Sequence, residues 1–340
     1  MKAAVWNETA GLDVIDVELP QPRPGWVRLR VAGSGVCGSD LHGLGKPEMG
    51  WAGMRPGHEI CGYVDALGDG VHLDTRSLMA VEPMDTCGTC VSCRAGLRNL
   101  CPDVALLGFG QLHGGLAEYV EAPANCLHPL PSGMSLSVAT LAEPLAVCAR
   151  AVRLSGLGFG QHVAVVGAGT IGLLSVAAAR AGGASSVHVI ARHPQQAELA
   201  MMLGADATYS DADSMLAAVG DRTCDVVIET VGGWSTTLID AVRVAAPAAT
   251  IVNVGCFEGD TPIPGPMFFE KELVLRASNC YAFDQGQSDF ALAARLLTKL
   301  GTSLEPLVTH RFALDQVAEA FETAFDKTSG SIKVQIQLDS

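Results

Sequence analysis

The fold of this chain is decided by the stretch Val163-Ala164-Val165-Val166-Gly167-Ala168-Gly169-Thr170-Ile171-Gly172. Four apolar residues predict a buried strand and helical spacing begins at Thr170, so the glycines lie between a strand and a helix. The Gly-x-Gly-x-x-Gly turn of a dinucleotide-binding fold requires this context. Its first glycine permits the tight turn, the second admits a pyrophosphate, and the third allows close helix–strand packing. Because the helix N-terminus offers amide donors to the phosphates, we expect a coenzyme to bind at Gly167, Gly169, Thr170, Ile171 and Gly172.

Strands and helices alternate on the C-terminal side of this turn. We expect helices at 170–181 and 195–203, and further apolar strands at 187–191, 225–229 and 250–254. This alternation predicts a doubly wound parallel sheet with right-handed crossovers. The fold class is therefore α/β, with a Rossmann domain over residues 149–284.

The residues after the second strand of this domain bear on the choice of coenzyme. NAD-binding proteins usually place a carboxylate there to hold the ribose hydroxyls, but this chain has Ala191, Arg192 and His193. A guanidinium can pair with a 2′-phosphate in bidentate fashion. We therefore predict NADP as the coenzyme, held in part by Arg192 and His193. NAD stays possible, since Arg192 could instead stack on adenine or face solvent.

The rest of the chain is rich in short strands and turns. Strands are expected at 27–32 and 59–65, helices from Pro144 and at 290–300 and 314–325, and a final strand at 332–336. We infer that the last segment returns to complete the first domain. This β-rich domain would comprise residues 1–148 and 285–340.

Four cysteines are crowded into the stretch 84–103, which has few large apolar residues. Cys87, Cys90, Cys93 and Cys101 offer four thiolates at short spacing. A structural zinc site takes four tetrahedral ligands, and the ion would replace the missing core of this lobe. Two disulfides or four unrelated thiols are the alternative.

A second metal site is suggested by Gly35-Val36-Cys37-Gly38-Ser39-Asp40-Leu41-His42 together with Gly57-His58-Glu59 and Glu143-Pro144. Cys37, His58 and either Glu59 or Glu143 could supply three ligands and leave a fourth position open, as a catalytic zinc requires. Taken singly, each of these residues has an ordinary explanation, because a lone cysteine is most often a small buried hydrophobe.

Composition excludes several classes of protein. The 340 residues carry a net charge of -14, which argues against a nucleic-acid partner and against an anionic membrane surface. No apolar run is long enough to cross a bilayer. The N-terminus, residues 1–8, is typical of a first strand and not of a signal peptide, so we expect a cytoplasmic protein. In a reducing compartment, the crowding of four of the 11 cysteines favours metal binding over disulfides.

Together these motifs resemble the zinc-containing medium-chain dehydrogenase/reductase superfamily, in particular its sorbitol and threonine dehydrogenase branch. The resemblance spans essentially the whole length and includes Pro56-Gly57-His58-Glu59 and Gly114-Gly115-Leu116-Ala117-Glu118-Tyr119. It implies a GroES-like catalytic domain, a Rossmann domain and two zinc ions per chain. It places Cys37, His58 and Glu143 near the catalytic zinc, with Glu59 as a close or exchanging ligand.

The same resemblance implies roles for two residues and a function. Ser39 and His42 match the family's proton relay. The expected reaction is reversible, zinc-dependent hydride transfer between a secondary alcohol and NADP, giving a ketone or aldehyde, in a homodimer or homotetramer paired through the Rossmann sheets. Many polyol dehydrogenases have arginine where this chain has Cys280, which counts against a sorbitol-like substrate. Possible pocket linings are Met49, Trp51, Phe109, Leu112, Cys280 and Tyr281.

Two alternatives remain at the level of sequence. One is an NAD-dependent polyol dehydrogenase, and the other is a catalytically silent zinc-binding regulator on the same fold. A zinc-independent enone reductase of the superfamily is disfavoured, because such enzymes lack the metal ligands that Cys37, His58 and Glu143 would supply.

Overall fold

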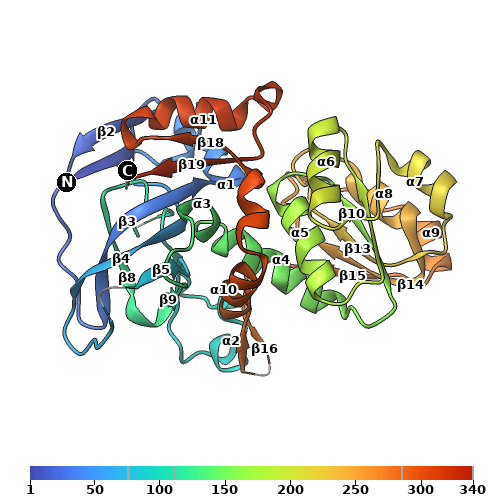
Figure 1. Ribbon diagram of the computed structural model, residues 1–340, viewed down its shortest axis with the longest axis horizontal. Helices are drawn as coiled ribbons and strands as arrows, with labels where there is room; N and C mark the ends of the chain where they lie inside the picture. The colour runs from blue at the N-terminus through green and yellow to red at the C-terminus, as the bar shows by residue number, and fades with distance from the viewer. Residues whose placement is uncertain (75–76, 111, 285, 339–340) are drawn as a thin grey trace. The chain divides into compact units, whose positions relative to one another are not determined.

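The computed structural model describes residues 1–74, 77–110, 112–284 and 286–338. The chain divides into two compact units (Figure 1). Unit 1 comprises Met1–Glu143 and Ala282–Ser340, and unit 2 comprises Pro144–Tyr281. The sequence placed these boundaries at 148/149 and 284/285, a few residues further along the chain; as domain limits they stay predictions.

Unit 2 is built on a six-stranded parallel sheet with the strand order β12-β11-β10-β13-β14-β15. This is the doubly wound order, in which the chain starts at the centre and moves first to one edge and then to the other. The predicted fold class is confirmed. The strands are β10 (His162–Val166), β11 (Ser186–Ile190), β12 (Ala207–Tyr209), β13 (Cys224–Glu229), β14 (Ala245–Asn253) and β15 (Val274–Ala277).

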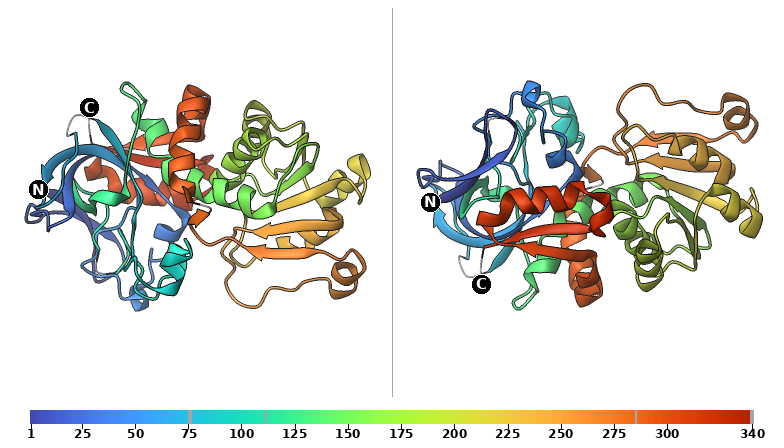
Figure 2. Two further views of the ribbon diagram at one scale, coloured as in Figure 1. Left: turned by 90° about the horizontal axis from the view of Figure 1, so that it is seen from below. Right: turned by 90° about the horizontal axis from the view of Figure 1, so that it is seen from above.

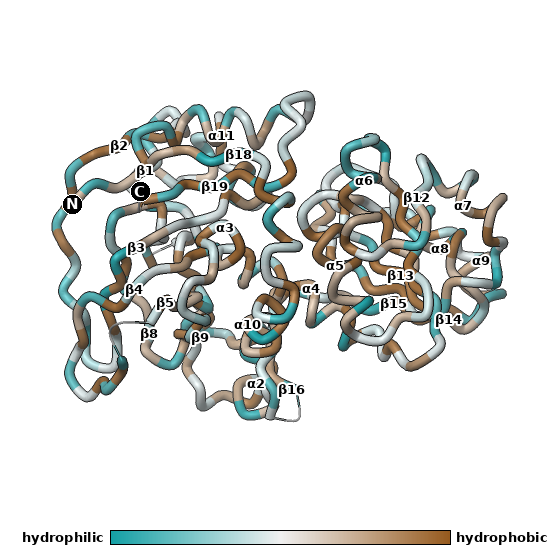
Figure 3. The backbone as a smooth tube through the Cα atoms, viewed as in Figure 1, coloured by the Kyte–Doolittle hydropathy of each residue, from teal (hydrophilic) through white to brown (hydrophobic). Residues whose placement is uncertain are grey.

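Helices cover both faces of this sheet, as right-handed crossovers demand. Figure 2 shows them on opposite sides of the strands, and Figure 3 shows the apolar character of the central strands. Val163, Val165 and Val227 are fully buried, as expected of strands covered on both faces. The helices are α4 (Ala142–Ser155), α5 (Thr170–Ala181), α6 (Pro194–Met202), α7 (Ala212–Val219), α8 (Thr237–Val244) and α9 (Gly265–Glu270).

Unit 1 is organised around the eleven-residue strand β3. β3 pairs with β4, β8 and β19, all antiparallel, within a seven-stranded sheet. Six of its strands follow the order β18-β19-β3-β4-β5-β9, and β8 pairs with β3 off this path. The last strand thus lies beside one near the N-terminus (Figure 1). The main strands are β3 (Trp26–Val36), β4 (Glu59–Leu67), β5 (Leu78–Val81), β8 (Tyr119–Pro123), β9 (Leu127–Pro129), β18 (Val308–Phe312) and β19 (Lys333–Gln337).

Two apolar clusters are formed by the described residues of unit 1. One lies along β3 and β4 and includes Leu29 and Ile60; the other packs Trp6 against Phe321. Short pairs of strands complete the unit: β1 (Lys2–Trp6) with β2 (Leu12–Asp16), β6 (Met84–Asp85) with β7 (Ala105–Leu106), and β16 (Phe283–Asp284) with β17 (Gln287–Ser288).

The helices of unit 1 are short, except for the two near the C-terminus. They are α1 (Gly38–Leu41), α2 (Val91–Arg94), α3 (Leu136–Ala139), α10 (Asp289–Leu300) and α11 (Val317–Phe325), with 3₁₀ turns at Pro47–Met49, Arg98–Leu100, Ala124–Cys126, Gly301–Leu307, Leu314–Gln316 and Lys327–Ser329. No helix among the described residues is long and apolar enough to span a membrane.

Candidate metal centres and coenzyme site

Three predicted metal ligands lie close together in unit 1, where strand β3 ends and its neighbour β4 begins. Cys37 follows the last residue of β3 and Glu59 opens β4, while His58 directly precedes Glu59. The antiparallel register pairs Gly35 with Glu59, which brings the two segments together. One ligand atom from each of Cys37, His58 and Glu59 lies within 4.8 Å of the others.

Gly35 is required by the close approach of the Glu59 side chain. A methyl group at this position would overlap the Glu59 carboxylate. The glycine two residues before Cys37 is therefore a packing requirement of the site, because only a residue without Cβ leaves room for the buried carboxylate.

Asp40 orients this site, and the sequence analysis did not select it. Its carboxylate Oδ2 accepts a hydrogen bond from the backbone N–H of Cys37 at 2.9 Å, and its Oδ1 lies 3.5 Å from Nδ1 of His58. Burial disfavours the charged imidazole, but Asp40 and Cys37 outweigh it and hold the pKa of His58 well above its usual value. A carboxylate behind a ligating histidine fixes the ring and strengthens its donor nitrogen. The signal for Asp40 was its place in the Cys-Gly-Ser-Asp stretch itself.

Glu59 is held by a buried cation that the sequence analysis also missed. Lys333, the first residue of β19, places Nζ at 2.6 and 2.8 Å from the two carboxylate oxygens of Glu59. The same Nζ donates to the carbonyl oxygen of Val36 at 3.0 Å. Burial disfavours the ammonium, but Glu59 and Cys37 outweigh it and raise the pKa of Lys333. No local pattern indicates this lysine, because it is 274 residues from Glu59.

Glu143 lies outside the three-residue cluster. It is buried in the first turn of α4, and burial raises its pKa to about 7. Cys37, His58 and Glu59 form the compact group among the described residues of this region. Of the two predicted glutamates, Glu59 is the one that lies close to Cys37 and His58. However, both carboxylate oxygens of Glu59 already accept hydrogen bonds from Lys333.

Ser39 lies on the short helix α1, and His42 is the residue that directly follows this helix. Ser39 is half-buried, whereas His42 is exposed and donates its backbone N–H to the carbonyl of Ser39 at 3.4 Å. The helix thus carries a hydroxyl close in sequence to Cys37, and an exposed imidazole follows its last residue. Their function as a relay stays a prediction.

Two of the predicted pocket linings form an aromatic wall next to the imidazole of His58. The ring of Phe109 lies 5.2 Å from that of His58, and the ring of Trp51 lies 6.0 Å from that of Phe109. Met49 is exposed. The aromatic pair thus packs against one side of the His58 imidazole.

The four cysteines of the lobe converge as expected of a structural metal site. Their ligand atoms lie within 4.8 Å of one another, with Cys87 Sγ at 4.0 Å from Cys93 Sγ and 3.5 Å from Cys101 Sγ. Tetrahedral zinc with Zn–S bonds of about 2.3 Å separates its sulfurs by about 3.8 Å. Backbone N–H donors of Thr89 and Cys90 lower the pKa of Cys87 to about 6. The residues therefore fit a Zn²⁺ ion, and all 11 cysteines are free thiols.

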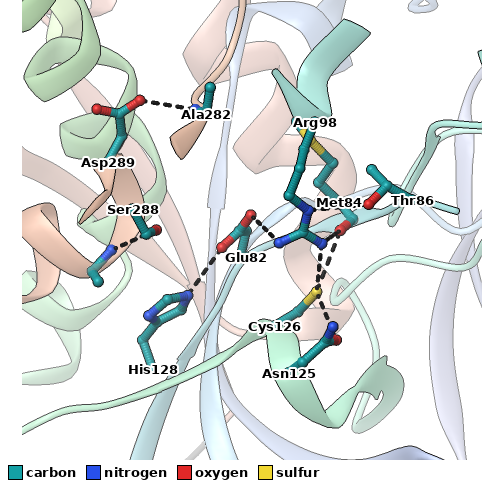
Figure 4. A network of polar contacts seen from close by, with 11 residues as sticks. Glu82, Met84, Thr86, Arg98, Asn125, Cys126, His128, Ala282, Ser288 and Asp289 are labelled. Atoms are coloured by element: carbon teal, nitrogen blue, oxygen red, sulfur yellow. Dashed lines mark hydrogen bonds and ion pairs between the residues drawn. The ribbon is translucent and has the colours of Figure 1, made fainter. Parts of the chain in front are cut away.

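A buried polar network joins the lobe to the core of unit 1 (Figure 4). Arg98 lies between two of the lobe cysteines in sequence and pairs with the buried carboxylate of Glu82 at 3.5 Å. His128 contacts the other oxygen of Glu82 at 3.0 Å, and its ring lies 4.7 Å from that of Phe290 in α10. Arg98 also donates to the hydroxyl of Thr86 at 3.0 Å. This network fixes the base of the lobe.

In unit 2, the glycine turn has the geometry that its motif predicts. Gly167 has a φ of 98°, which an L side chain rarely adopts. A methyl group at Gly172 would overlap the carbonyl oxygen of Gly167, so the helix packs directly on the turn. A cavity of about 280 Å³ opens here, and its lining includes Gly167, Gly169, Arg192 and His193. Thr170 and Ile171 form the first turn of α5.

The same cavity contains acidic side chains that the sequence analysis did not place there. Asp211 and Asp240 line it together with Arg192. Burial raises the pKa of Asp240, and the nearby charges of Arg243 and Arg192 lower it. A coenzyme 2′-phosphate paired with Arg192 would therefore also lie near the carboxylate of Asp240. The prediction of NADP was based on the lack of an acidic residue directly after β11, and this second carboxylate weakens it.

Comparisons with known proteins agree with this arrangement. Residues 23–132 match the alcohol dehydrogenase GroES-like domain, and residues 170–299 match the zinc-binding dehydrogenase family. The chain is 32% identical over 332 residues to galactitol 1-phosphate 5-dehydrogenase of Escherichia coli K12, covering 94% of this chain and 95% of the relative. It is 29% identical over 347 residues to sorbitol dehydrogenase of Bacillus subtilis, covering 99% and 97%. The chain belongs to the zinc-containing medium-chain dehydrogenase family, as its motifs predicted.

Solved structures show the same fold with either coenzyme. The crystal structure of galactitol-1-phosphate dehydrogenase from Escherichia coli has a TM-score of 0.91 at 30% identity, covering 99% of this chain and 100% of that one. A putative zinc-binding dehydrogenase from Sinorhizobium meliloti bound to NADP has a TM-score of 0.88 at 29% identity, covering 99% and 98%. An alcohol dehydrogenase from Escherichia coli complexed with NADH has the same score and identity, covering 99% of each chain. The protein is thus an oxidoreductase of the alcohol and polyol dehydrogenase type.

Proposed function

We propose that this protein transfers a hydride reversibly between a secondary alcohol and a nicotinamide coenzyme, using one catalytic and one structural zinc ion per chain. The observation that carries the proposal is the convergence of Cys37 and His58, with the carboxylate of Glu59 next to them, because a thiolate and an imidazole are donor types of a catalytic zinc site. The substrate is a polyol, cyclitol, amino alcohol or simple alcohol.

The catalytic ion would be held by Cys37, His58 and a glutamate. When bound, it supplies a Lewis acid that polarises the substrate oxygen and lowers the pKa of a hydroxyl. We assign the resident glutamate to Glu143, because Lys333 engages both oxygens of Glu59. Glu59 would then act from behind the ligands, keeping a negative charge close to Cys37 and His58.

The proton of the alcohol is assigned to the α1 helix. Ser39 would accept it within hydrogen-bond reach and give up its own hydroxyl proton at the same time. His42, which is exposed, would pass that proton on to solvent. Asp40 holds the backbone of Cys37 and faces the imidazole of His58, so the ligands are set before substrate arrives. Phe109 and Trp51 pack against one side of the His58 imidazole.

The coenzyme is assigned to the glycine turn of unit 2, with NADP preferred through Arg192 and His193. Asp240 tempers this preference, so Asp240→Asn should raise the ratio of kcat/KM for NADP to that for NAD. Arg192→Ala should raise the KM for NADP and leave the KM for NAD nearly unchanged. An equal effect of Arg192→Ala on both coenzymes would remove the reason for preferring NADP.

We further propose a homodimer or homotetramer paired through the sheets of unit 2. The support is the edge strand β15, all four residues of which are exposed, with Val274 at 43% and Leu275 at 37%. An exposed apolar edge is a template for pairing with a second chain. Light scattering of Leu275→Lys beside the wild type tests this, and a wild-type monomer would refute it.

The deciding experiment follows reduced-nicotinamide absorbance with zinc-loaded protein, NADP or NAD, and a panel of alcohols. We expect one class of secondary alcohol to reduce the coenzyme, and Cys37→Ala and His58→Ala to abolish turnover. Full turnover after loss of the catalytic metal would refute the site. No signal across the panel, in protein shown to hold two zinc ions per chain, would instead favour the silent zinc-binding regulator.

A further inference from the structure

Unit 1 contains a cavity that belongs to neither metal centre. It has a volume of about 310 Å³ and lies beside the start of β3, strand β8 and the segment that precedes β8. Its lining includes Trp26, Arg55, Leu107, Leu112, His113 and Glu121. A cavity of this size matches the lower end of small-ligand sites in proteins.

The walls of the cavity combine apolar and cationic surface. Leu107, Leu112 and Val120 supply the apolar part. The guanidinium of Arg23 lies 3.6 Å from the ring centroid of Trp26, so one side of the indole is stacked with a cation. Such a lining suits a planar, apolar molecular body.

Arg55 is the cation that this environment leaves available. Its side chain is half-buried, and no hydrogen bond or ion pair to its guanidinium is found within residues 1–74, 77–110, 112–284 and 286–338. Burial lowers the pKa of Arg55 while the carboxylate of Glu121 raises it, but an arginine stays charged in proteins. A half-buried guanidinium without a hydrogen-bonded acceptor is a vacant site for a planar anion.

The charge balance of the cavity sets the charge of the ligand. Arg23 and Arg55 each contribute a positive charge and Glu121 a negative one, which also accepts the backbone N–H of Arg23 at 3.2 Å. Burial, and then the charge of Arg55, lower the pKa of His113, so this imidazole is neutral at pH 7. One net positive charge suits a monoanion, whereas a phosphate monoester carries close to two charges and would be repelled by Glu121.

We infer that this cavity binds a small aromatic carboxylate, with its carboxylate paired to the Arg55 guanidinium and its ring packed on Trp26, Leu107 and Leu112. Arginine and carboxylate match in bidentate geometry. The site is separate from the catalytic cluster, although Phe109, which packs on His58, lies in the same segment as Leu107 and Leu112. The test must therefore distinguish binding here from binding at the catalytic metal.

Ligand-observed NMR with benzoate tests the inference, with benzyl alcohol as the neutral analogue and inorganic phosphate as the other anion. At about 0.3 kcal/mol per heavy atom, a ligand of this size is expected to reach half-saturation at about 10 mM. We expect Arg55→Gln to weaken benzoate about tenfold, as loss of a charge-assisted pair does. Leu112→Trp, which fills the cavity, should abolish binding. Arg295→Gln, an exposed arginine on α10, is the control with the same charge change and should leave the affinity unchanged.

Three results would overturn the inference. The first is equal benzoate affinity in Arg55→Gln and wild type, with the thermal midpoint showing that the variant is folded. The second is loss of binding in His58→Ala, which would assign benzoate to the catalytic metal. The third is competition by phosphate or benzyl alcohol as strong as that of a second carboxylate.

Discussion

Replacing Lys333 by methionine should unfold unit 1 far more easily, because it leaves Glu59 charged and buried without its cation. The ammonium makes three contacts, two with the Glu59 carboxylate and one with the Val36 carbonyl, and its side chain is 4% exposed. Breaking a buried ion pair by removing one partner costs about 3–5 kcal/mol. For a unit of about 200 residues, this lowers the thermal midpoint by roughly 10 °C.

The assay is thermal unfolding of metal-free protein at pH 7, so that metal binding does not contribute. Lys299→Met, an exposed lysine on α10, is the matched control and should shift the midpoint by under about 2 °C. The double variant Glu59→Gln/Lys333→Met should lose less stability than the sum of the single variants, because no unpaired charge remains. A loss below about 1 kcal/mol for Lys333→Met would show that the pair behaves like a surface ion pair, and the reasoning would fail.

Three further perturbations test other parts of the structure. In metal-free protein, burial raises the pKa of Glu143 from its ordinary 4.5 to about 7. Between these two values the folded state binds more protons than the unfolded state. The protonated Glu143 therefore adds about 3 kcal/mol to the free energy of unfolding at low pH, and this is lost as the pH rises through 7. Thermal midpoints at pH 5 and 8 should show this fall, and Glu143→Gln should reduce it. Arg98→Gln should lower the free energy of unfolding in urea by about 1–3 kcal/mol, because the buried carboxylate of Glu82 loses a partner. Arg94→Gln, which changes an exposed arginine of the same lobe, is the control and should leave that free energy unchanged. Gly172→Ala should weaken reduced-coenzyme binding more than tenfold by fluorescence titration, since its Cβ would push on Gly167; unchanged affinity would refute the packing argument.

The parts of the fold that local sequence encodes were predicted closely. Helix α5 has the predicted bounds, Thr170–Ala181, because an apolar strand and three glycines fix its start. Strand β11 and helix α6 each begin and end one residue earlier than predicted. Helix α11 begins at Val317, three residues later than predicted, because the chain first makes a 3₁₀ turn at Leu314–Gln316.

The site was predictable only where its residues share a motif. Cys37, His58 and the lobe cysteines were selected by spacing, and the structure gathers each set. Lys333 could not be selected, since a lysine in a strand usually faces water and its partner is far away in sequence. The choice between Glu59 and Glu143 also depends on Lys333, which is why the residues alone left it open.

The position of Lys333 has a consequence for how the protein is made. Glu59 and the lysine that neutralises it are 274 residues apart, and a ribosome adding about 5–20 residues per second needs roughly 10 to 60 s to span that interval. During this time β3 lacks its neighbour β19, and the carboxylate beside Cys37 has no cation to accompany it into the interior. Unit 2, whose strands and crossover helices are all encoded between Pro144 and Tyr281, can meanwhile fold from contiguous chain. The order of synthesis therefore delays closure of unit 1 until unit 2 has been produced.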